Sequence, residues 1–191
     1  MEQPIVERFL PPQVQLSNTI RKIWVDMNRL IRGYIVSVVF NVGGQASKDA
    51  INAALERVSQ ELRSLIIQYY SDDIGNQVQT DFYNFIYHLE QMIEAYSVKD
   101  EKAVTQHRNS LYFFANIYAQ SYAVINNYLN RATIKALFYE LINSVENQII
   151  SALDQDFVRD IEEYEAFMNI AYRLADEFTF GFLRQFFNTP E

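Results

Sequence analysis

Apolar residues recur along most of the chain at alternating steps of three and four, the heptad spacing by which one helix packs along others. The longest such seam lies in residues 156–187. Its apolar positions are Phe157, Ile161, Tyr164, Met168, Ala171, Ala175, Phe178 and Phe182. A helix of about 30 residues runs to roughly 45 Å, longer than a small domain is wide. Other helices must lie alongside it, so the sequence predicts an all-α bundle.

Turn and capping residues divide the rest of the chain into further helices. Pro11 and Pro12 disfavour a helix at that point, Gly43 and Gly44 end the first helix, and Ser71, Asp100 and Asn130 are suitable N-caps. No proline occurs in residues 14–189, so long uninterrupted helices are expected. The pattern predicts six helices, at residues 18–42, 48–70, 72–96, 101–128, 131–153 and 155–187.

The same pattern suggests one domain with an extension. Residues 1–15 are predicted to form an N-terminal arm, and residues 16–191 a single helical-bundle domain. An alignment of the chain with itself that places Ile51 on Ile134 also places Ser71 on Asp154. In this alignment, polar and apolar positions agree between residues 18–98 and residues 101–187. Two duplicated three-helix units sharing one core explain this agreement, and so does the general likeness of heptad faces.

Composition narrows the classes of function. The net charge of −8 argues against nucleic acid, whose binding depends on a basic surface, and against anionic membranes. The absence of cysteine excludes disulfides and thiolate metal sites. No apolar run approaches the length of a membrane span, and no signal-peptide pattern opens the chain. We therefore expect a cytoplasmic protein.

The candidate chemistry is sparse. The chain has two histidines, His88 and His107, on the third and fourth predicted helices. Di-iron bundles need Glu-x-x-His pairs, but Phe85 and Val104 stand three residues before the histidines. Zinc needs three or four ligands, so two histidines and a carboxylate make only a partial set. We expect ordinary helix histidines, no metal and no cofactor, and an enzyme is the least favoured reading.

Aromatic content is the unusual feature, with 13 tyrosines and 14 phenylalanines. The fourth predicted helix is the most apolar, and Tyr112, Tyr118 and Tyr122 crowd it. A helix that is apolar on most sides is generally central in its bundle or covered by a partner. Such residues are enriched at interfaces and in ligand clefts, although a thick aromatic core explains the same content.

Several short motifs occur in order, almost without gaps, along residues 20–186. They are Trp24-x-Asp26 with Arg32, Tyr70-Ser71-Asp72-Asp73-Ile74-Gly75-Asn76, Lys99-Asp100-x-x-Ala103-Val104, Tyr112, Asn126, and the ending from Ala175-Asp176 to Gln185-Phe186. Together they resemble a family of small, largely uncharacterised all-helical proteins, mainly from spore-forming Gram-positive bacteria. Some members carry an acetylglutamate kinase label, but such a kinase needs an α/β core and glycine-rich phosphate loops, which this sequence does not predict.

The resemblance also identifies departures from the family pattern. Relatives tend to carry histidine, tryptophan, histidine, tryptophan and asparagine at the positions of Met27, Leu30, Phe85, Leu111 and Phe114. Because this chain has an apolar residue at each of the five positions, no metal or catalytic role is carried over to it.

Two functional hypotheses follow. The leading one is a non-enzymatic bundle that self-associates or binds a protein partner through an aromatic surface. The alternative is a binder of a small apolar or aromatic ligand inside the bundle, which needs a cavity of about 300 Å³ or more. The candidate residues are Trp24, Met27, Leu30, Phe85, Leu111, Phe114 and Tyr118. We expect Trp24 to be mostly buried against the third or sixth helix.

Overall fold

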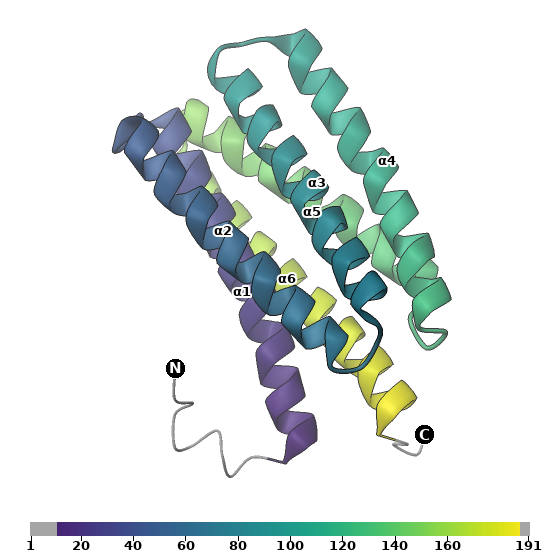
Figure 1. Ribbon diagram of the computed structural model, residues 1–191. Coiled ribbons are helices and arrows are strands. Elements are labelled where there is room, and N and C mark those ends of the chain that lie inside the picture. The colour runs from purple at the N-terminus through teal and green to yellow at the C-terminus, as the bar shows by residue number, and fades with distance from the viewer. Residues whose placement is uncertain (1–10, 188–191) are drawn as a thin grey trace.

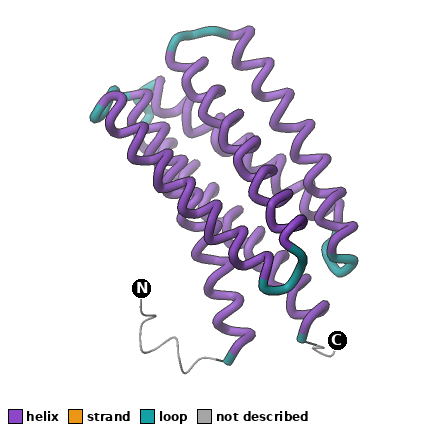
Figure 2. Tube along the Cα trace, in the orientation of Figure 1, coloured by secondary structure: helices purple, strands orange, loops and turns teal. Residues whose placement is uncertain are grey.

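The computed structural model describes residues 11–187, which form six helices and contain no strand (Figures 1 and 2). The helices are α1 Pro12–Val39, α2 Gly44–Ile67, α3 Asp72–Ser97, α4 Glu101–Ile125, α5 Arg131–Leu153 and α6 Phe157–Phe186. The predicted all-α six-helix bundle is therefore confirmed. No helix in the described part of the chain is both long and apolar enough to cross a membrane.

Side-chain caps set four of the helix starts. The side chain of Ser71 accepts a hydrogen bond from the amide of Ile74, Asp100 does so from Ala103, and Asp156 from Arg159. Asn130 accepts from two amides in the first turn of α5. Each cap satisfies backbone donors that a helix start leaves without an intrahelical partner, which is why these boundaries follow from the sequence.

The first helix begins earlier than predicted, at Pro12 instead of residue 18. Proline is tolerated in the first turn because its missing N–H has no partner there, and its fixed φ suits a helix. Residues 12–15 of the predicted arm are thus helical, whereas residues 1–10 lie outside the described residues. The second helix also starts early, at Gly44, where Gly43 adopts a left-handed φ of 71° that glycine tolerates.

The helices alternate in direction, and Figure 1 shows their antiparallel arrangement. α1, α3 and α5 run the same way and contact one another inside the bundle. α2 packs against α1 and α3, α4 against α3 and α5, and α6 against α5 and α1. Three outer helices therefore close a ring around three inner ones.

This arrangement bears on two of the predictions. α4, expected to be central or covered by a partner, is an outer helix, and the inner positions are taken by α1, α3 and α5. A duplication of three-helix units would pair α2 with α5 and α3 with α6. Each of those pairs joins an outer helix to an inner one, and the duplication stays a prediction.

The predicted seam of α6 is correct in its second half and wrong in its first. Phe182, Ala175 and Ala171 are buried, but Phe157 and Ile161 are each 58% exposed. The inward position in the first turns belongs to Asp160, which is buried and ion-paired with Arg32 of α1. Because the inward-facing residue here is charged, the apolar pattern placed the buried side of α6 one residue too late.

Candidate functional site

An apolar pocket of about 70 Å³ lies in the interior, with walls from all six helices. Four of the seven candidate residues line it, namely Trp24, Met27, Phe85 and Tyr118. The other three lie elsewhere: Leu111 is fully buried, and Leu30 and Phe114 are half-buried against the core. The structure therefore brings together about half of the predicted site. The pocket is also smaller than the cavity of about 300 Å³ that a typical ligand needs.

Trp24 is half-buried at this pocket. Its ring stacks on Phe178 of α6, with ring centroids 5.6 Å apart, and meets the edge of Phe138 on α5 at 6.0 Å. The predicted contact with the sixth helix is therefore present, together with a contact to α5 that the sequence did not indicate. The indole is one wall of the pocket and packs against the core with most of its surface shielded from solvent, as predicted.

A carboxyl group, Asp81, also lines the pocket and was missed in the sequence. Only 4% of Asp81 is exposed, and its hydrogen bond comes from Nε2 of Gln77, one turn earlier, at 2.7 Å. Burial raises the pKa of Asp81 to about 6, although the hydrogen bond from Gln77 lowers this pKa in part. Burial, with the charge of Asp81, also raises the pKa of Tyr118 and Tyr122. The signal was available, because Asp81 occupies a core-facing position between apolar residues of α3.

A chain of ring contacts runs from this pocket to the surface of α3 and α4. Phe138 meets Tyr118 at a centroid distance of 6.4 Å, and Tyr118 stacks on Phe114 at 5.7 Å. Phe114 in turn stacks on His88 at 5.3 Å. Two residues proposed from the sequence, Tyr118 and Phe114, therefore connect the interior to the outer surface.

That outer surface carries exposed large apolar side chains and is called here the α3–α4 face. Its residues are Tyr83 and Tyr87 of α3 and Phe113, Ile117 and Val124 of α4. Phe113 is 61% exposed and Val124 80% exposed. No Asp, Glu, Lys or Arg occurs between Arg108 and Arg131, so most of α4 is uncharged although it is an outer helix.

A second exposed apolar group lies where α1 ends and α6 begins. Phe40 contacts Phe157 with ring centroids 6.2 Å apart, and Val158 and Ile161 lie next to Phe157 on α6. Charged residues are interspersed here, including Arg159 within the same helical turn. Charge is therefore what distinguishes this group from the α3–α4 face.

The two histidines meet within the α3–α4 face. Nδ1 of His88 lies 3.0 Å from Nδ1 of His107, and the ring of Tyr87 contacts both imidazoles. Burial, followed by the neighbouring His107, lowers the pKa of His88. The sequence placed these residues on adjacent helices, but their contact depends on how α3 and α4 are rotated about their axes.

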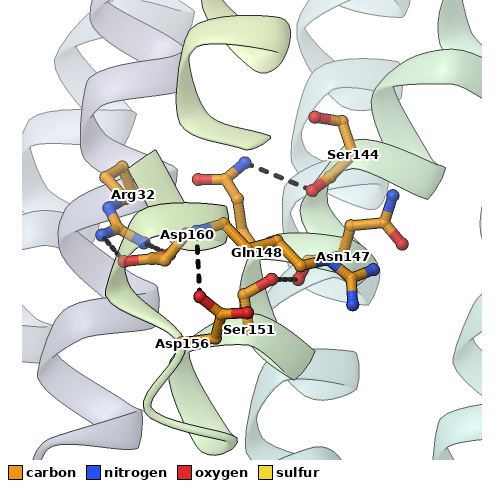
Figure 3. Close-up of polar contacts among 8 residues, drawn as sticks. Arg32, Ser144, Asn147, Gln148, Ser151, Asp156 and Asp160 are labelled. Carbon is orange, nitrogen blue, oxygen red and sulfur yellow. Dashed lines mark hydrogen bonds and ion pairs between the residues drawn. The ribbon is translucent and has the colours of Figure 1, made fainter. Parts of the chain in front are cut away.

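Buried polar groups join α1, α5 and α6 (Figure 3). Figure 3 shows Arg32 reaching from α1 to Asp160 on α6, with Nη1 2.6 Å from Oδ1. Gln148 on α5 is fully buried and donates to the carbonyl of Ser144 at 3.3 Å. Asn28 donates to the carbonyl of Phe167 at 2.8 Å. The hydroxyl groups of Ser144 and Ser151 donate to the backbone carbonyls of Glu163 and Asn147.

The carboxylates do not assemble a metal centre with the histidines. Among residues 11–187, no three His, Cys, Asp or Glu side chains gather closely enough to hold an ion. The paired acids have structural roles or face solvent: Asp72 follows the Ser71 cap of α3, Asp176 pairs with Arg21, and Glu162 is exposed. The enzyme hypothesis that required three such ligands thus has no site in the described part of the chain.

Comparison of the chain with protein-family models, with curated proteins and with solved structures found no match.

Proposed function

We propose that this protein is a non-enzymatic interaction protein that self-associates through the α3–α4 face. The observation that carries the proposal is the absence of charge along most of an outer helix. Surfaces of monomers rarely expose large contiguous apolar patches, and the centre of a protein interface is depleted of charged residues and enriched in aromatic ones. Phe113, Tyr83 and Tyr87 match that composition.

The uncharged part of the face is large enough to form the centre of an interface. It covers residues 109–125 of α4, which are about 26 Å long, and two adjacent helices span about 20 Å. This part covers roughly 500 Å², more than half of the 800 Å² or so that each partner buries in a standard interface. A second copy that docks α4 along α4 would cover most of Phe113, Ile117 and Val124.

Net charge supports a second copy as the partner. Each chain carries a net charge of −8, so two copies repel one another wherever their acidic surfaces approach. A face without charged residues is where this repulsion is smallest. The α3–α4 face therefore allows two equally acidic molecules to meet, and a symmetrical pairing would use the same patch on both copies.

The experiment is light scattering on the purified chain and two matched variants. Wild-type protein is expected at twice 22.4 kDa, and Phe113→Glu is expected at the monomer mass, because a charge in the interface centre is costly to desolvate. Val158→Glu is the control, since Val158 is 73% exposed on the distant start of α6. A monomeric wild type, or dissociation by Val158→Glu but not by Phe113→Glu, would refute the proposal.

The alternative function uses the interior pocket, favoured by its apolar walls and its single buried carboxyl group. Its volume of about 70 Å³ restricts the ligand to a very small molecule unless the walls move. A thermal-shift screen of small apolar and aromatic compounds tests this function, and replacing Phe85 with leucine enlarges the pocket for comparison. A cytoplasmic location and kinship with the bacterial family described above remain part of the proposal.

A further inference from the structure

Asp81 of α3 is an ionisable group enclosed among apolar and aromatic side chains. It lines the interior pocket and is only 4% exposed. Among residues 11–187, no Lys, Arg or His lines this pocket, and Asp81 accepts its hydrogen bond from the neutral amide of Gln77. A buried carboxylate is normally paired with a cation, and the described chain supplies none here. We propose that the pocket binds a small organic ammonium ion, with Asp81 as its counter-ion.

The carboxyl group of Asp81 lies near two tyrosines of α4 that line the same pocket. After the larger effect of burial, the charge of Asp81 raises the pKa of both Tyr118 and Tyr122. The hydroxyl oxygen of Tyr118 is buried and makes no hydrogen bond of ordinary geometry within the described residues, although the side chain of Asn84 lowers its pKa in part. Asp81 and Tyr118 therefore both offer oxygen acceptors to the N–H groups of an ammonium ion.

The walls of the pocket suit an organic cation better than a metal ion. Trp24, Phe85 and Phe138 are among the rings that line it. The face of an aromatic ring attracts a cation, and the attraction is stronger where water is excluded. Ca²⁺ instead takes about six to eight oxygen ligands, and Mg²⁺ keeps several waters, which apolar walls and one carboxyl group do not provide. An alkylammonium ion can bury its carbon atoms against these walls and direct its charge to Asp81.

The volume of the pocket sets the size of the ion. A cavity of about 150 Å³ holds benzene, and this pocket of about 70 Å³ has roughly half that space. It therefore has room for about three or four non-hydrogen atoms, as in propylammonium. The best ligands of this size reach a dissociation constant of about 40 µM, so we expect binding between this value and the millimolar range. This site rests on the pocket of the alternative function and does not depend on self-association.

Ionisation of Asp81 sets the pH dependence of binding. Burial raises the pKa of Asp81 to about 6, so the carboxyl group is about one-tenth ionised at pH 5 and almost fully ionised at pH 8. Burial also raises the pKa of Tyr70, Tyr118 and Tyr122, the other titratable residues of the described walls, so they stay neutral in this range. An alkylamine stays charged, as lysine does. Binding should therefore be about 10-fold tighter at pH 8 than at pH 5.

Fluorescence titration with propylammonium chloride tests the site, because the chain's single tryptophan, Trp24, is part of the pocket wall. Propan-1-ol is the matched control ligand, since it has the same number of non-hydrogen atoms and no charge. At pH 8 we expect saturable binding of propylammonium and about 10- to 150-fold weaker binding of propan-1-ol, the contribution of a hydrogen bond to a charged group. Asp81→Asn should weaken propylammonium binding by the same factor, whereas Asp49→Asn, on the surface, should bind as the wild type does.

Equal affinities for propylammonium and propan-1-ol would overturn the ammonium site and leave the pocket as a site for neutral ligands. Propylammonium binding that is unchanged in Asp81→Asn, or unchanged between pH 5 and pH 8, would overturn it too. Failure of both ligands to bind would overturn the ammonium site and count against the alternative function as well. Circular dichroism melts check that Asp81→Asn is folded, and the pH comparison on the wild type needs no variant. Light scattering tests self-association separately, so either proposal can fail alone.

Discussion

Replacing Asp81 with asparagine removes a charge from the interior while keeping the shape of the side chain. Asp81 is 4% exposed, has no cationic partner among the described residues, and accepts its hydrogen bond from the neutral amide of Gln77. An ionised carboxylate in apolar surroundings is costly. We therefore predict that Asp81→Asn stabilises the protein at high pH.

The magnitude follows from linkage. Burial raises the pKa of Asp81 from 3.8 to about 6, so between these values the folded state binds more protons than the unfolded chain. Stability then falls as the pH rises through this window and is lowest above it. At 1.36 kcal/mol per pKa unit, the loss is about 3 kcal/mol. Asparagine does not titrate, so the variant should gain about 3 kcal/mol at pH 8 and nothing below about pH 4 from this cause.

Thermal and urea unfolding of wild type and variant across this pH range measure the difference. A gain of 3 kcal/mol corresponds to a melting temperature about 6–12 °C higher for a protein of this size. Asp49→Asn is a close control, because Gln45 donates to Asp49 at 2.7 Å across one helical turn just as Gln77 does to Asp81, but on the surface. If Asp81→Asn gives the same difference at pH 5 and pH 8, the carboxyl group is not the buried acid described here.

Two further predictions concern packing. Arg32→Met should lower the free energy of unfolding by about 3–5 kcal/mol, because it leaves the buried carboxylate of Asp160 unpaired. The double variant Arg32→Met/Asp160→Leu should recover most of this loss in urea titrations, and a double variant as unstable as the single one contradicts the reasoning. Gly181→Ala should cost about 1–3 kcal/mol, since its Cβ would lie 2.5 Å from Cδ2 of Leu129. Gly33→Ala, whose Cβ meets atoms no closer than 3.6 Å, should instead raise the melting temperature.

Helix identity and most helix ends could be predicted because they depend on local interactions. The caps at Ser71 and Asn130 are formed by residues within three positions of the amides that they satisfy. The predicted start of α1 was wrong because a proline such as Pro12 is compatible with two local structures. A proline disfavours helix in the residue before it and equally suits the first helical turn, and the choice depends on what residues 12–17 pack against.

The candidate site was only half predictable, because its members come from several helices. Met27 and Phe85 meet at the pocket, whereas Leu111 lies in the core away from it. Each helical position differs from the next by a rotation of about 100°. A heptad pattern therefore shows which side of one helix faces inward, but it does not show which residues of the other helices that side contacts. The contact between His88 and His107 has the same origin and left no pattern in the sequence.

α4 combines an apolar sequence with an outer position in the bundle. An apolar helix is explained by a central position or by a covering partner, and the sequence does not separate the two. The structure gives the inner positions to α1, α3 and α5 and places α4 outside. Burial within one chain therefore does not account for Phe113 and Val124. Selection for solubility would favour charged residues at such positions, so their absence along an outer helix is the reason to look for a second copy on this face first.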